Sequence, residues 1–368
     1  MQFSFGIEEE YFLVDRIGNA VVRRMPDGFL ANAKAEMGER VSGEFLQSQV
    51  EIVTLPHTCA DAARADVRAL RTCLAGIADR YGMAIMAAGT HPTAVWERSR
   101  QSAGERYDNV MDDLQMIGRR NMLCGMHVHV ELPDPDKRID VMSRMIPYLP
   151  LLIALSTSSP FWRSSATGLL GYRLAAYDEL PRTGIPELFR TREEFDTYSD
   201  ALVRAGVMPD ASYIWWAIRP SFKHPTLELR APDSCTRIED SIAIASLYRV
   251  LARWLTQNPE KNRDMTAVSR AIVVENKWRA QRYGVRGTFA RVDGNGPITV
   301  SDMLDRTIAD ILPDAQALGC ADAVQHCRTI AAQGTSADRQ IEIYEQNIDD
   351  PDRAMREVTA WLTRTTLA

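Results

Sequence analysis

Four short segments of the chain alternate apolar and polar residues, the pattern of strands that bury one face. Their polar positions carry carboxylate, imidazole, amide or guanidinium groups, whereas a solvated sheet face more often carries Thr, Lys and Ser. Glu9 is the exception, because it falls among the apolar positions. The apolar and polar sets are Phe5, Ile7, Tyr11 and Leu13 against Glu8 and Glu10; Val50 and Ile52 against Gln47, Gln49 and Glu51, within a strand predicted over Phe45–Leu55; Met126, Val128, Val130 and Leu132 against His127, His129 and Glu131; and Leu227 and Leu229 against Glu228 and Arg230.

Elsewhere apolar residues recur at spacings of three and four, which predicts amphipathic helices. We predict one helix from an N-cap at Thr58 to about Gly82 and another directly after the fourth strand. Two more follow an N-cap at Ser336, separated by Pro351. The apolar stripes of these four helices are Val67, Leu70, Leu74, Ile77 and Tyr81; Ile244, Leu247, Tyr248, Leu251, Trp254 and Leu255; Ile341, Tyr344 and Ile348; and Met355, Val358 and Leu362.

The uncharged run Met145–Trp162 is about as long as the roughly 18-residue minimum for a membrane-spanning helix. It contains Pro147, Pro150 and Pro160 and four consecutive hydroxyl side chains at positions 156 to 159. Because proline and clustered hydroxyl groups suit a helix and its exit loop better than a span, we predict a buried helix and expect no membrane partner.

Composition places the chain among ordinary globular proteins, with 368 residues, 45% hydrophobic and 25% charged. No linker divides it, so we predict one domain over residues 1–368, with a helical C-terminal part from about residue 300. The net charge of -6, with interspersed signs, argues against nucleic acid. Six cysteines without a CxxC pair and an N-terminus without a basic start predict a cytoplasmic protein with reduced thiols.

If the four strands are neighbours, their carboxylates converge. A pair of like charges about 4 Å apart costs roughly 4 kcal/mol at an effective dielectric of about 20, and divalent cations would remove that cost. Carboxylates with an imidazole are ligands for Mg²⁺ or Mn²⁺, and Mg²⁺ is usually completed by substrate phosphates. The sequence has no GxxxxGK[ST] or GxGxxG loop, so metal ions and an arginine such as Arg230 would hold a nucleotide's phosphates.

Each pattern also has a plainer interpretation. A lone Glu-x-Glu strand is most often solvated, and Glu228 with Arg230 could be a structural ion pair. An H-x-H strand also occurs in zinc-dependent amidohydrolases, although there it usually lies near the chain start and no acids precede it. Trp215 and Trp216 are expected on a strand, one in the core and one facing a cleft or a partner. The basic and aromatic tract Glu275–Gly284 could simply be a solvated helix end.

Five segments resemble a known family in its order: FGIEEEYFLVD, FLQSQVEIVT, CGMHVHVELPD, GYRLAAYDELPRTG and PTLELRAPD. They are similar to the glutamate-cysteine ligase type 2 family, carboxylate-amine ligases related to glutamine synthetase. The resemblance runs from about residue 3 to about residue 290. It implies an α+β, glutamine-synthetase-like catalytic fold, in which a curved antiparallel sheet forms one wall of a funnel-shaped active site and helices pack outside.

The resemblance also implies roles for individual residues, with ATP and two or three Mg²⁺ (or Mn²⁺) ions as cofactors. His129 matches the position that approaches ATP phosphate, and Arg230 a contact to phosphate or substrate carboxylate. Arg173 and Arg182 resemble the arginines of the substrate pocket, and Arg173 and Arg230 are the expected catalytic residues. The matching metal ligands are Glu8, Glu10, Glu51, His127 and Glu228.

The implied reaction is ATP-dependent formation of an amide from glutamate or a related acid, through an acyl phosphate. Cysteine is the family's nominal amine, but this chain is much shorter than the long glutamate-cysteine ligases, which leaves the amine open, and no general base is evident. Two other functions remain: a phosphagen-kinase-like phosphotransferase and a catalytically idle metabolite-binding protein of the same fold. The expected partners are small-molecule substrates, and the family suggests a homodimer.

Overall fold

The structure is a computed structural model that describes residues 3–368, apart from the Arg106 side chain. Its strands are β1 (Phe5–Asp15), β2 (Val41–Gly43), β3 (Gln49–Val53), β4 (Met83–Met86), β5 (Met126–Glu131), β6 (Phe161–Trp162), β7 (Ser165–Ala166), β8 (Ile218–Pro220), β9 (Thr226–Leu229), β10 (Thr288–Ala290) and β11 (Pro297–Thr299). Its α-helices are α1 (Phe29–Met37), α2 (Ala60–Asp79), α3 (Glu105–Leu114), α4 (Met116–Arg119), α5 (Arg138–Met145), α6 (Leu149–Ser156), α7 (Tyr172–Tyr177), α8 (Arg192–Arg204), α9 (Ile238–Gln257), α10 (Ala267–Tyr283), α11 (Val300–Ala317), α12 (Ala321–Gln333), α13 (Ser336–Glu345) and α14 (Pro351–Thr365). The expected α+β class is confirmed.

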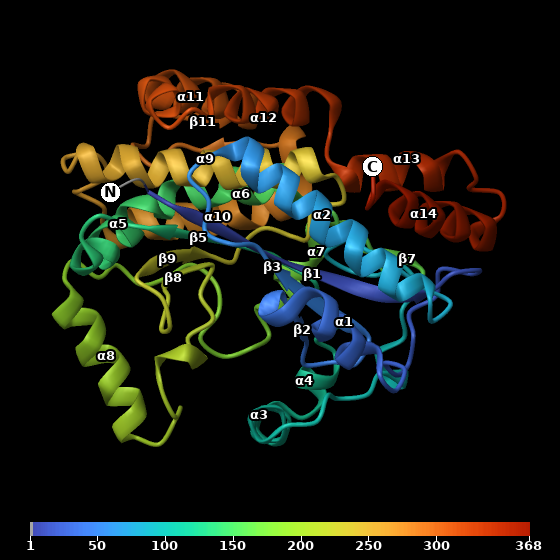
Figure 1. Cartoon of the computed structure of the whole chain (residues 1–368). Helices are drawn as coiled ribbons and strands as arrows, with labels where there is room; N and C mark the ends of the chain where they lie inside the picture. The colour runs from blue at the N-terminus through green and yellow to red at the C-terminus, as the bar shows by residue number, and fades with distance from the viewer. Residues whose placement is uncertain (1–2) are drawn as a thin grey trace.

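An antiparallel sheet in the order β2-β3-β1-β5-β9-β8 forms the middle of the molecule (Figure 1). One edge of β1 is shared, because β5 pairs with its first half and β4 with its second half. The register places Glu8 opposite His127, Glu10 opposite Glu51, and His129 opposite Glu228. Directly opposed residues point to the same face. The polar positions that lie on the strands therefore come together on one face of the sheet, whereas Gln47 and Arg230 lie beyond the strand ends.

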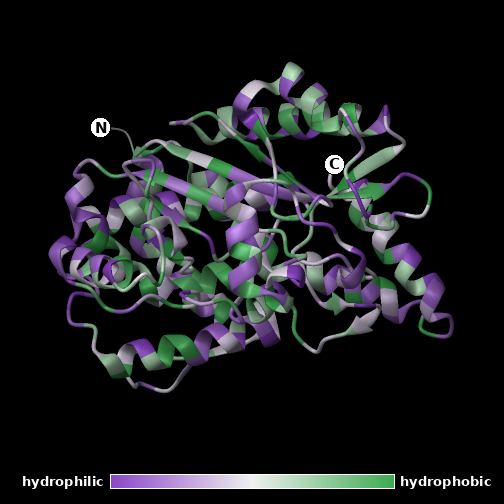
Figure 2. Cartoon of the chain, turned by 90° about the horizontal axis from the view of Figure 1, so that it is seen from below, coloured by the Kyte–Doolittle hydropathy of each residue, from purple (hydrophilic) through white to green (hydrophobic). Residues whose placement is uncertain are grey.

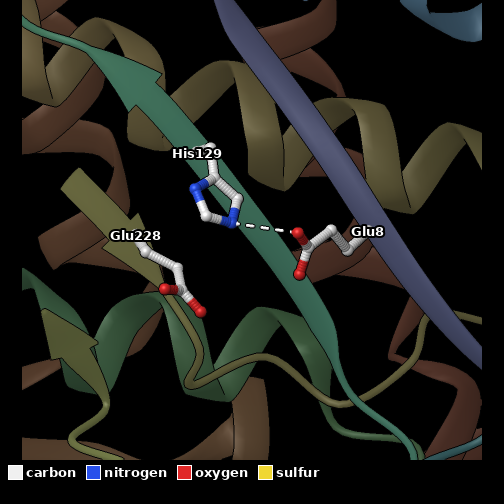
Figure 3. A group of neighbouring side chains, drawn as sticks. All are labelled: Glu8, His129 and Glu228. Atoms are coloured by element: carbon white, nitrogen blue, oxygen red, sulfur yellow. Dashed lines mark ion pairs between the residues drawn. The ribbon is translucent and has the colours of Figure 1, made fainter. Parts of the chain in front are cut away.

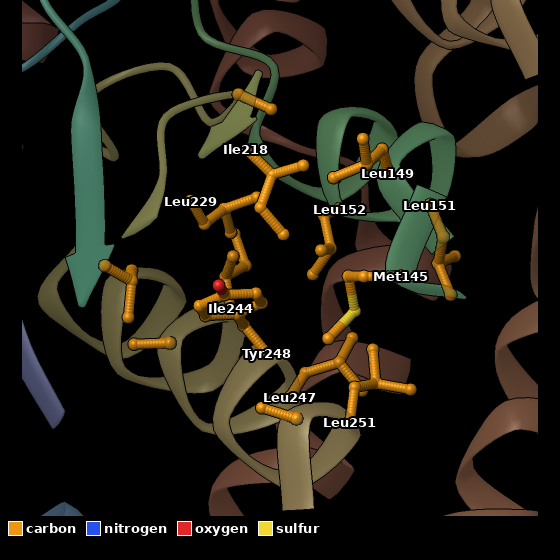
Figure 4. Packing of buried hydrophobic residues seen from close by; sticks show 14 of the residues in the cluster. Met145, Leu149, Leu151, Leu152, Ile218, Leu229, Ile244, Leu247, Tyr248 and Leu251 are labelled. Carbon is orange, nitrogen blue, oxygen red and sulfur yellow. The ribbon is translucent and has the colours of Figure 1, made fainter. Parts of the chain in front are cut away.

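The opposite, apolar face of the sheet packs against helices (Figures 1 and 4). Leu229 and Ile218 from β9 and β8 meet Leu152 of α6 and Ile244 and Tyr248 of α9 in one cluster. Full burial of each such aliphatic side chain contributes about 1.5–3 kcal/mol. This packing fixes which face of the sheet is left for polar groups.

Glu9 departs from the alternation because it forms an internal ion pair. Its carboxylate accepts two hydrogen bonds from Arg71 of α2, at 2.9 and 2.7 Å, and one from Ser241 of α9 at 2.6 Å. The side chains of Glu9 and Arg71 are both completely buried. Neighbouring carboxylates on β1 thus serve opposite faces: Glu9 ties the strand to two helices, whereas Glu8 and Glu10 face the other side.

Several predicted boundaries shift. The predicted strand over Phe45–Leu55 is shorter, because β3 begins only at Gln49, and Trp215 and Trp216 precede β8 instead of lying on a strand. Of the two, Trp216 is buried and Trp215 is only partly buried. Between β2 and β3 a turn at residues 47–48 replaces the predicted strand, because the chain there reverses direction into the next paired segment.

The predicted helices lie where they were expected, but several of their ends differ from the prediction. Helix α2 is capped at Cys59 rather than Thr58 and ends before Tyr81. Helix α13 is capped by Thr335, whose side chain forms a capping box with Asp338. The prediction for Ile348 was wrong: it is 59% exposed beyond the end of α13, because Ile343 takes the buried position. In α14, Met355, Val358 and Leu362 are buried as expected, and Pro351 begins the helix instead of interrupting one.

The stretch Pro135–Ser156 is long and apolar enough to cross a membrane, but 78% of its most apolar window is buried inside the protein. Every residue of α6 is buried. This agrees with the predicted core helix. The C-terminal helices α11 to α14 lie outside α9 and β4, and the helices of the exterior mix hydrophilic and hydrophobic positions (Figure 2). A single domain over the whole chain stays a prediction.

Candidate active site

Among the residues that the structure describes, the polar face of the sheet gathers three overlapping groups of side chains that could each hold a metal ion. In each group, one ligand atom per residue lies within 4.8 Å of the others. We call Glu8, His129 and Glu228 the paired cluster (Figure 3) and Glu10, Glu44 and Glu51 the acid cluster. The third group, Glu8, Glu51 and His127, joins the two clusters. All five predicted metal ligands therefore meet on this face.

The paired cluster is neutralised by cations of the protein itself. Arg219 donates to both oxygens of Glu228 at 2.8 and 3.1 Å, and Arg230 donates to one of them at 2.5 Å. Burial alone would raise the pKa of Glu228, but Arg230 and Arg219 hold it well below its usual range. In Figure 3 the His129 ring points toward Glu8, with Nε2 3.2 Å from Oε1. Burial lowers the pKa of His129, but Glu8 outweighs burial and raises it.

The acid cluster has no such cations. In the described part of the chain, no lysine or arginine forms an ion pair with Glu10, Glu44 or Glu51, although His127 Nε2 lies 3.7 Å from Glu10 Oε1. Burial and the charge of Glu10 raise the pKa of Glu44 to about 8. Burial and the charge of Glu8 raise the pKa of Glu51 well above its usual value. Three converging carboxylates that repel one another form a set of oxygen ligands that suits Mg²⁺ or Mn²⁺.

Two cavities open at different ends of this face. The first, which we call the arginine pocket, has a volume of about 150 Å³, and the second, the histidine pocket, has a volume of about 410 Å³. The arginine pocket is lined by Glu10, Glu44, Phe45, Gln49, Tyr107, Val110, Leu114, Gly118, Asn121, Leu123, Arg173, Tyr177, Leu180, Trp215 and Arg230. The histidine pocket is lined by Ser4, Phe5, Gly6, Glu8, Val53, Thr54, Pro56, His129, Glu131, His224, Pro225 and Thr226.

Arg173 reaches the arginine pocket through a gap left by a glycine. A Cβ atom at Gly125 would lie only 2.1 Å from Arg173 Nη2, so only glycine leaves room for the guanidinium. The Gly125 amide also donates to Glu10 at 2.5 Å, which couples the pocket to the acid cluster. Arg173 Nη1 donates to the carbonyl of Pro232 at 3.1 Å, while its buried Nε has no hydrogen-bond partner within residues 3–368 as described.

The structure separates Arg182 from the other site residues predicted from the sequence. Arg182 does not line the arginine pocket; its guanidinium lies 5.5 Å from the ring centroid of Trp215, and its Nε donates to the carbonyl of Tyr213 at 2.9 Å. It therefore supports the wall of the pocket from behind. Of the two tryptophans, Trp215 is the one that lines the pocket.

Sequence reasoning missed Glu44 and Arg219. Glu44 lies one residue before the predicted strand, where alternation gives no information about its direction. Arg219 follows Ile218 in a short apolar run, and only the pairing of β8 with β9 places it opposite Glu228. The tract Glu275–Gly284 lines neither pocket: Lys277 pairs with Asp178, and Arg279 donates to the Thr288 side chain at 2.8 Å.

The family model of the glutamate-cysteine ligase family 2 matches residues 4–358, nearly the whole chain. The chain belongs to this family. A relative from Bradyrhizobium diazoefficiens, named "Putative glutamate--cysteine ligase 2", is 54% identical over 367 residues, which covers 100% of this chain and 85% of that protein.

Solved structures place this member of the glutamate-cysteine ligase family 2 in a known fold. It is similar to a bifunctional glutathione synthetase from Pasteurella multocida, with a TM-score of 0.72 and 17% identity over 99% of this chain; it spans about half of that protein, 53%. It is also similar to a glutamate-cysteine ligase from Francisella tularensis in complex with AMP, with a TM-score of 0.69 and 14% identity over 100% of this chain and 90% of the other. The expected glutamine-synthetase-like fold is confirmed.

Proposed function

We propose that this chain is an ATP-dependent carboxylate-amine ligase of the glutamate-cysteine ligase type, a cytoplasmic enzyme that acts on small molecules. One observation carries the proposal: the acid cluster, which has no arginine or lysine partner among the described residues, adjoins a pocket that holds two guanidinium groups. Uncompensated carboxylates suit metal ions with bound phosphates, and guanidinium groups suit a substrate carboxylate. The same face would thus bind both the phosphates of the phosphoryl donor and the carboxylate that accepts the phosphoryl group.

Different groups of residues would hold the different metal ions. Glu10, Glu44 and Glu51 would hold one ion, and the groups that contain Glu8 would hold one or two more, with His127, His129 and Glu228 as further ligands. Bound Mg²⁺ would neutralise the charge of the transferred phosphoryl group. The donor set fits, because each group combines carboxylate oxygens with at most one imidazole.

We place the nucleotide in the histidine pocket and the acid substrate in the arginine pocket. The wider histidine pocket reaches Glu8 and His129, so its occupant can present phosphates to the metal face. The AMP bound by the similar Francisella ligase supports a nucleotide on this fold. Arg230, which already donates to Glu228, and Arg173 would hold the acid's carboxylates beside Glu10.

In the proposed reaction, the acid's carboxylate oxygen attacks the terminal phosphorus of ATP and the bond to ADP breaks. The amine nitrogen then attacks the acyl carbon, the carbon–oxygen bond to phosphate breaks, and the nitrogen loses a proton to solvent. Arg173 and Arg230 offset negative charge on the acid in both steps, so the residues act mainly by positioning and electrostatics. The products are ADP, phosphate and an amide. We assign no general base.

The test is release of ADP from Mg²⁺-ATP with glutamate and a panel of amines, with wild type and Glu51→Gln. Glu51 is the suitable ligand to change, because among the described residues its side chain otherwise accepts one hydrogen bond, from Ser42 at 3.3 Å. We expect turnover to fall about a thousandfold, or roughly 4 kcal/mol. The control is Glu36→Gln on α1, whose exposed carboxylate pairs with Arg80. Full activity in Glu51→Gln would refute the metal assignment.

Analysis of the product separates this proposal from the two other functions. A ligase releases free phosphate only when acid and amine are both present. A phosphagen-kinase-like enzyme would instead accumulate a stable phosphorylated acceptor, and an idle binding protein would release no ADP with any pair. The homodimer suggested by the family stays a prediction, which sedimentation or light scattering would test.

A further inference from the structure

Away from the acid cluster, the lining of the arginine pocket is mainly aromatic and aliphatic. Phe45 and Tyr107 form one wall, with ring centroids 5.8 Å apart in an edge-to-face arrangement. Tyr177 and Trp215 also line the pocket. Val110 and Leu114 of α3 complete an apolar lining. Aromatic pockets of this kind favour flat or branched apolar groups over charged ones.

The described side chains of the pocket include few cations for a second amino acid. Among the side chains that the structure describes, its cationic lining is Arg173 and Arg230. Arg230 already donates to Glu228, and to the Tyr177 hydroxyl at 3.3 Å, while Arg173 Nη1 already donates to the carbonyl of Pro232. The two guanidinium groups therefore have few N–H donors left beyond those that the acid's own carboxylates need. Glutamate and cysteine together bring two carboxylates besides the reacting one. Burial of a carboxylate without a partner is costly, so the pocket accommodates only one of the two.

Asn121 supplies a polar contact of the type that an amine needs. Its Oδ1 is buried, lacks a hydrogen-bond partner among the residues that the structure describes, and belongs to a residue that lines the pocket. An amide oxygen accepts hydrogen bonds, so it suits an N–H group and not a carboxylate.

Given the proposed ligase function, we propose that the acceptor substrate is a primary amine with an aromatic or branched apolar substituent and no carboxylate. Its nitrogen lies near Asn121 and its substituent between the aromatic walls. Arg173 then remains available for the α-carboxylate of the acid. The nominal acceptor of the family, cysteine, fits this pocket less well because it brings the additional carboxylate.

The experiment compares amines that differ only by that carboxylate, with saturating glutamate and Mg²⁺-ATP. The pairs are 2-phenylethylamine against phenylalanine and cysteamine against cysteine. We expect kcat/KM to be at least tenfold higher for the decarboxylated member of each pair, and highest for 2-phenylethylamine. A higher kcat/KM for cysteine than for both amines would overturn the acceptor assignment and leave the ligase function intact. Absence of ADP release with every pair would refute the ligase function as well.

A variant locates the effect in the pocket. Trp215→Leu should lower kcat/KM for 2-phenylethylamine at least tenfold more than it lowers kcat/KM for cysteamine, and Trp215→Phe should restore most of that difference. The matched control is Trp278→Leu, because Trp278 is 47% exposed on α10 and lines neither pocket. Equal losses for both amines in a folded Trp215→Leu protein would refute this placement. The substrate pairs with wild type test the proposal even if the variant does not fold.

Discussion

The two clusters on the polar face hold their carboxylates in different ways. In the paired cluster, Arg219 and Arg230 bind Glu228 directly, and the pKa of that carboxyl lies well below its usual range. In the acid cluster, the carboxylates face one another, and the pKa of Glu44 is raised to about 8. The paired cluster is therefore already stabilised within the protein, whereas the acid cluster becomes stable in its ionised form only when a cation enters.

This difference separates, on a single sheet face, a carboxylate that the protein's own cations compensate from carboxylates that have no such compensation. A buried carboxylate with two guanidinium partners contributes to the fold, since loss of either member leaves an uncompensated charge. A carboxylate held among other carboxylates is unfavourable until a ligand compensates it. Substitutions in the two clusters should therefore affect stability in different ways even where both abolish activity.

The largest expected contrast is between Glu228→Ala and Glu51→Ala. Both should lose turnover about a thousandfold or more, because each removes a proposed metal ligand. Only Glu228→Ala should also lose about 3–5 kcal/mol of unfolding free energy, because it leaves Arg219 and Arg230 without their carboxylate. Urea unfolding in EDTA measures the difference. Equal stability losses would show that the two clusters do not differ as described.

Glu9→Gln extends the comparison to a carboxylate on the apolar side of β1. The change should lower stability by about 3 kcal/mol, because it removes the charge that compensates the buried Arg71. The KM for ATP and the dependence on Mg²⁺ should stay near wild type at a temperature where the variant is folded. Glu8→Gln, one residue away, should instead change the KM for ATP and the dependence on Mg²⁺, with little loss of stability. The same effects on stability and on kinetics in both variants would contradict the assignment of opposite faces.

Gly125→Ala tests the link between the acid cluster and the arginine pocket. The new Cβ would displace Arg173, so kcat/KM for the acid should fall about a hundredfold, the size expected from roughly 1 Å of misplacement. Gly76→Ala in α2 is the control, since a Cβ atom added at Gly76 would meet no neighbouring side chain within 4 Å. Unchanged acid kinetics in a folded Gly125→Ala protein would remove Arg173 from the substrate pocket.

The smallest expected effect is the pH dependence of the metal-free protein. Because the folded-state pKa of Glu44 is about 8 and its ordinary value is 4.5, folded protein retains a proton that unfolded protein has lost between these values. Stability should therefore fall as pH rises from about 4.5 to about 8. We expect stability to fall by about 1.4 kcal/mol for each pH unit within this range, which is the slope for a difference of one bound proton. Thermal unfolding in EDTA checks this, and Glu44→Gln or added Mg²⁺ should flatten the profile.

The sequence by itself determined the polar face. Alternation along a strand is a local property, so spacing alone placed Glu8 and Glu10, His127, and Glu228 opposite the apolar face of their own strands. That these polar faces form one side of a sheet depended on the strand register. The same applies to the buried stripe of α9, because helical periodicity needs no knowledge of the rest of the chain. The family resemblance added the proposed roles, which geometry alone does not assign.

Only the tertiary structure decided which groups compensate each other. Arg219 meets Glu228 through the register of β8 and β9, and Arg71 reaches Glu9 across 62 positions of the chain. The place of Glu44 in the acid cluster and the gap that Gly125 leaves for Arg173 likewise depend on contacts between distant segments. Local patterns fix the direction of a side chain relative to its own strand or helix, whereas its partners depend on how those elements pack.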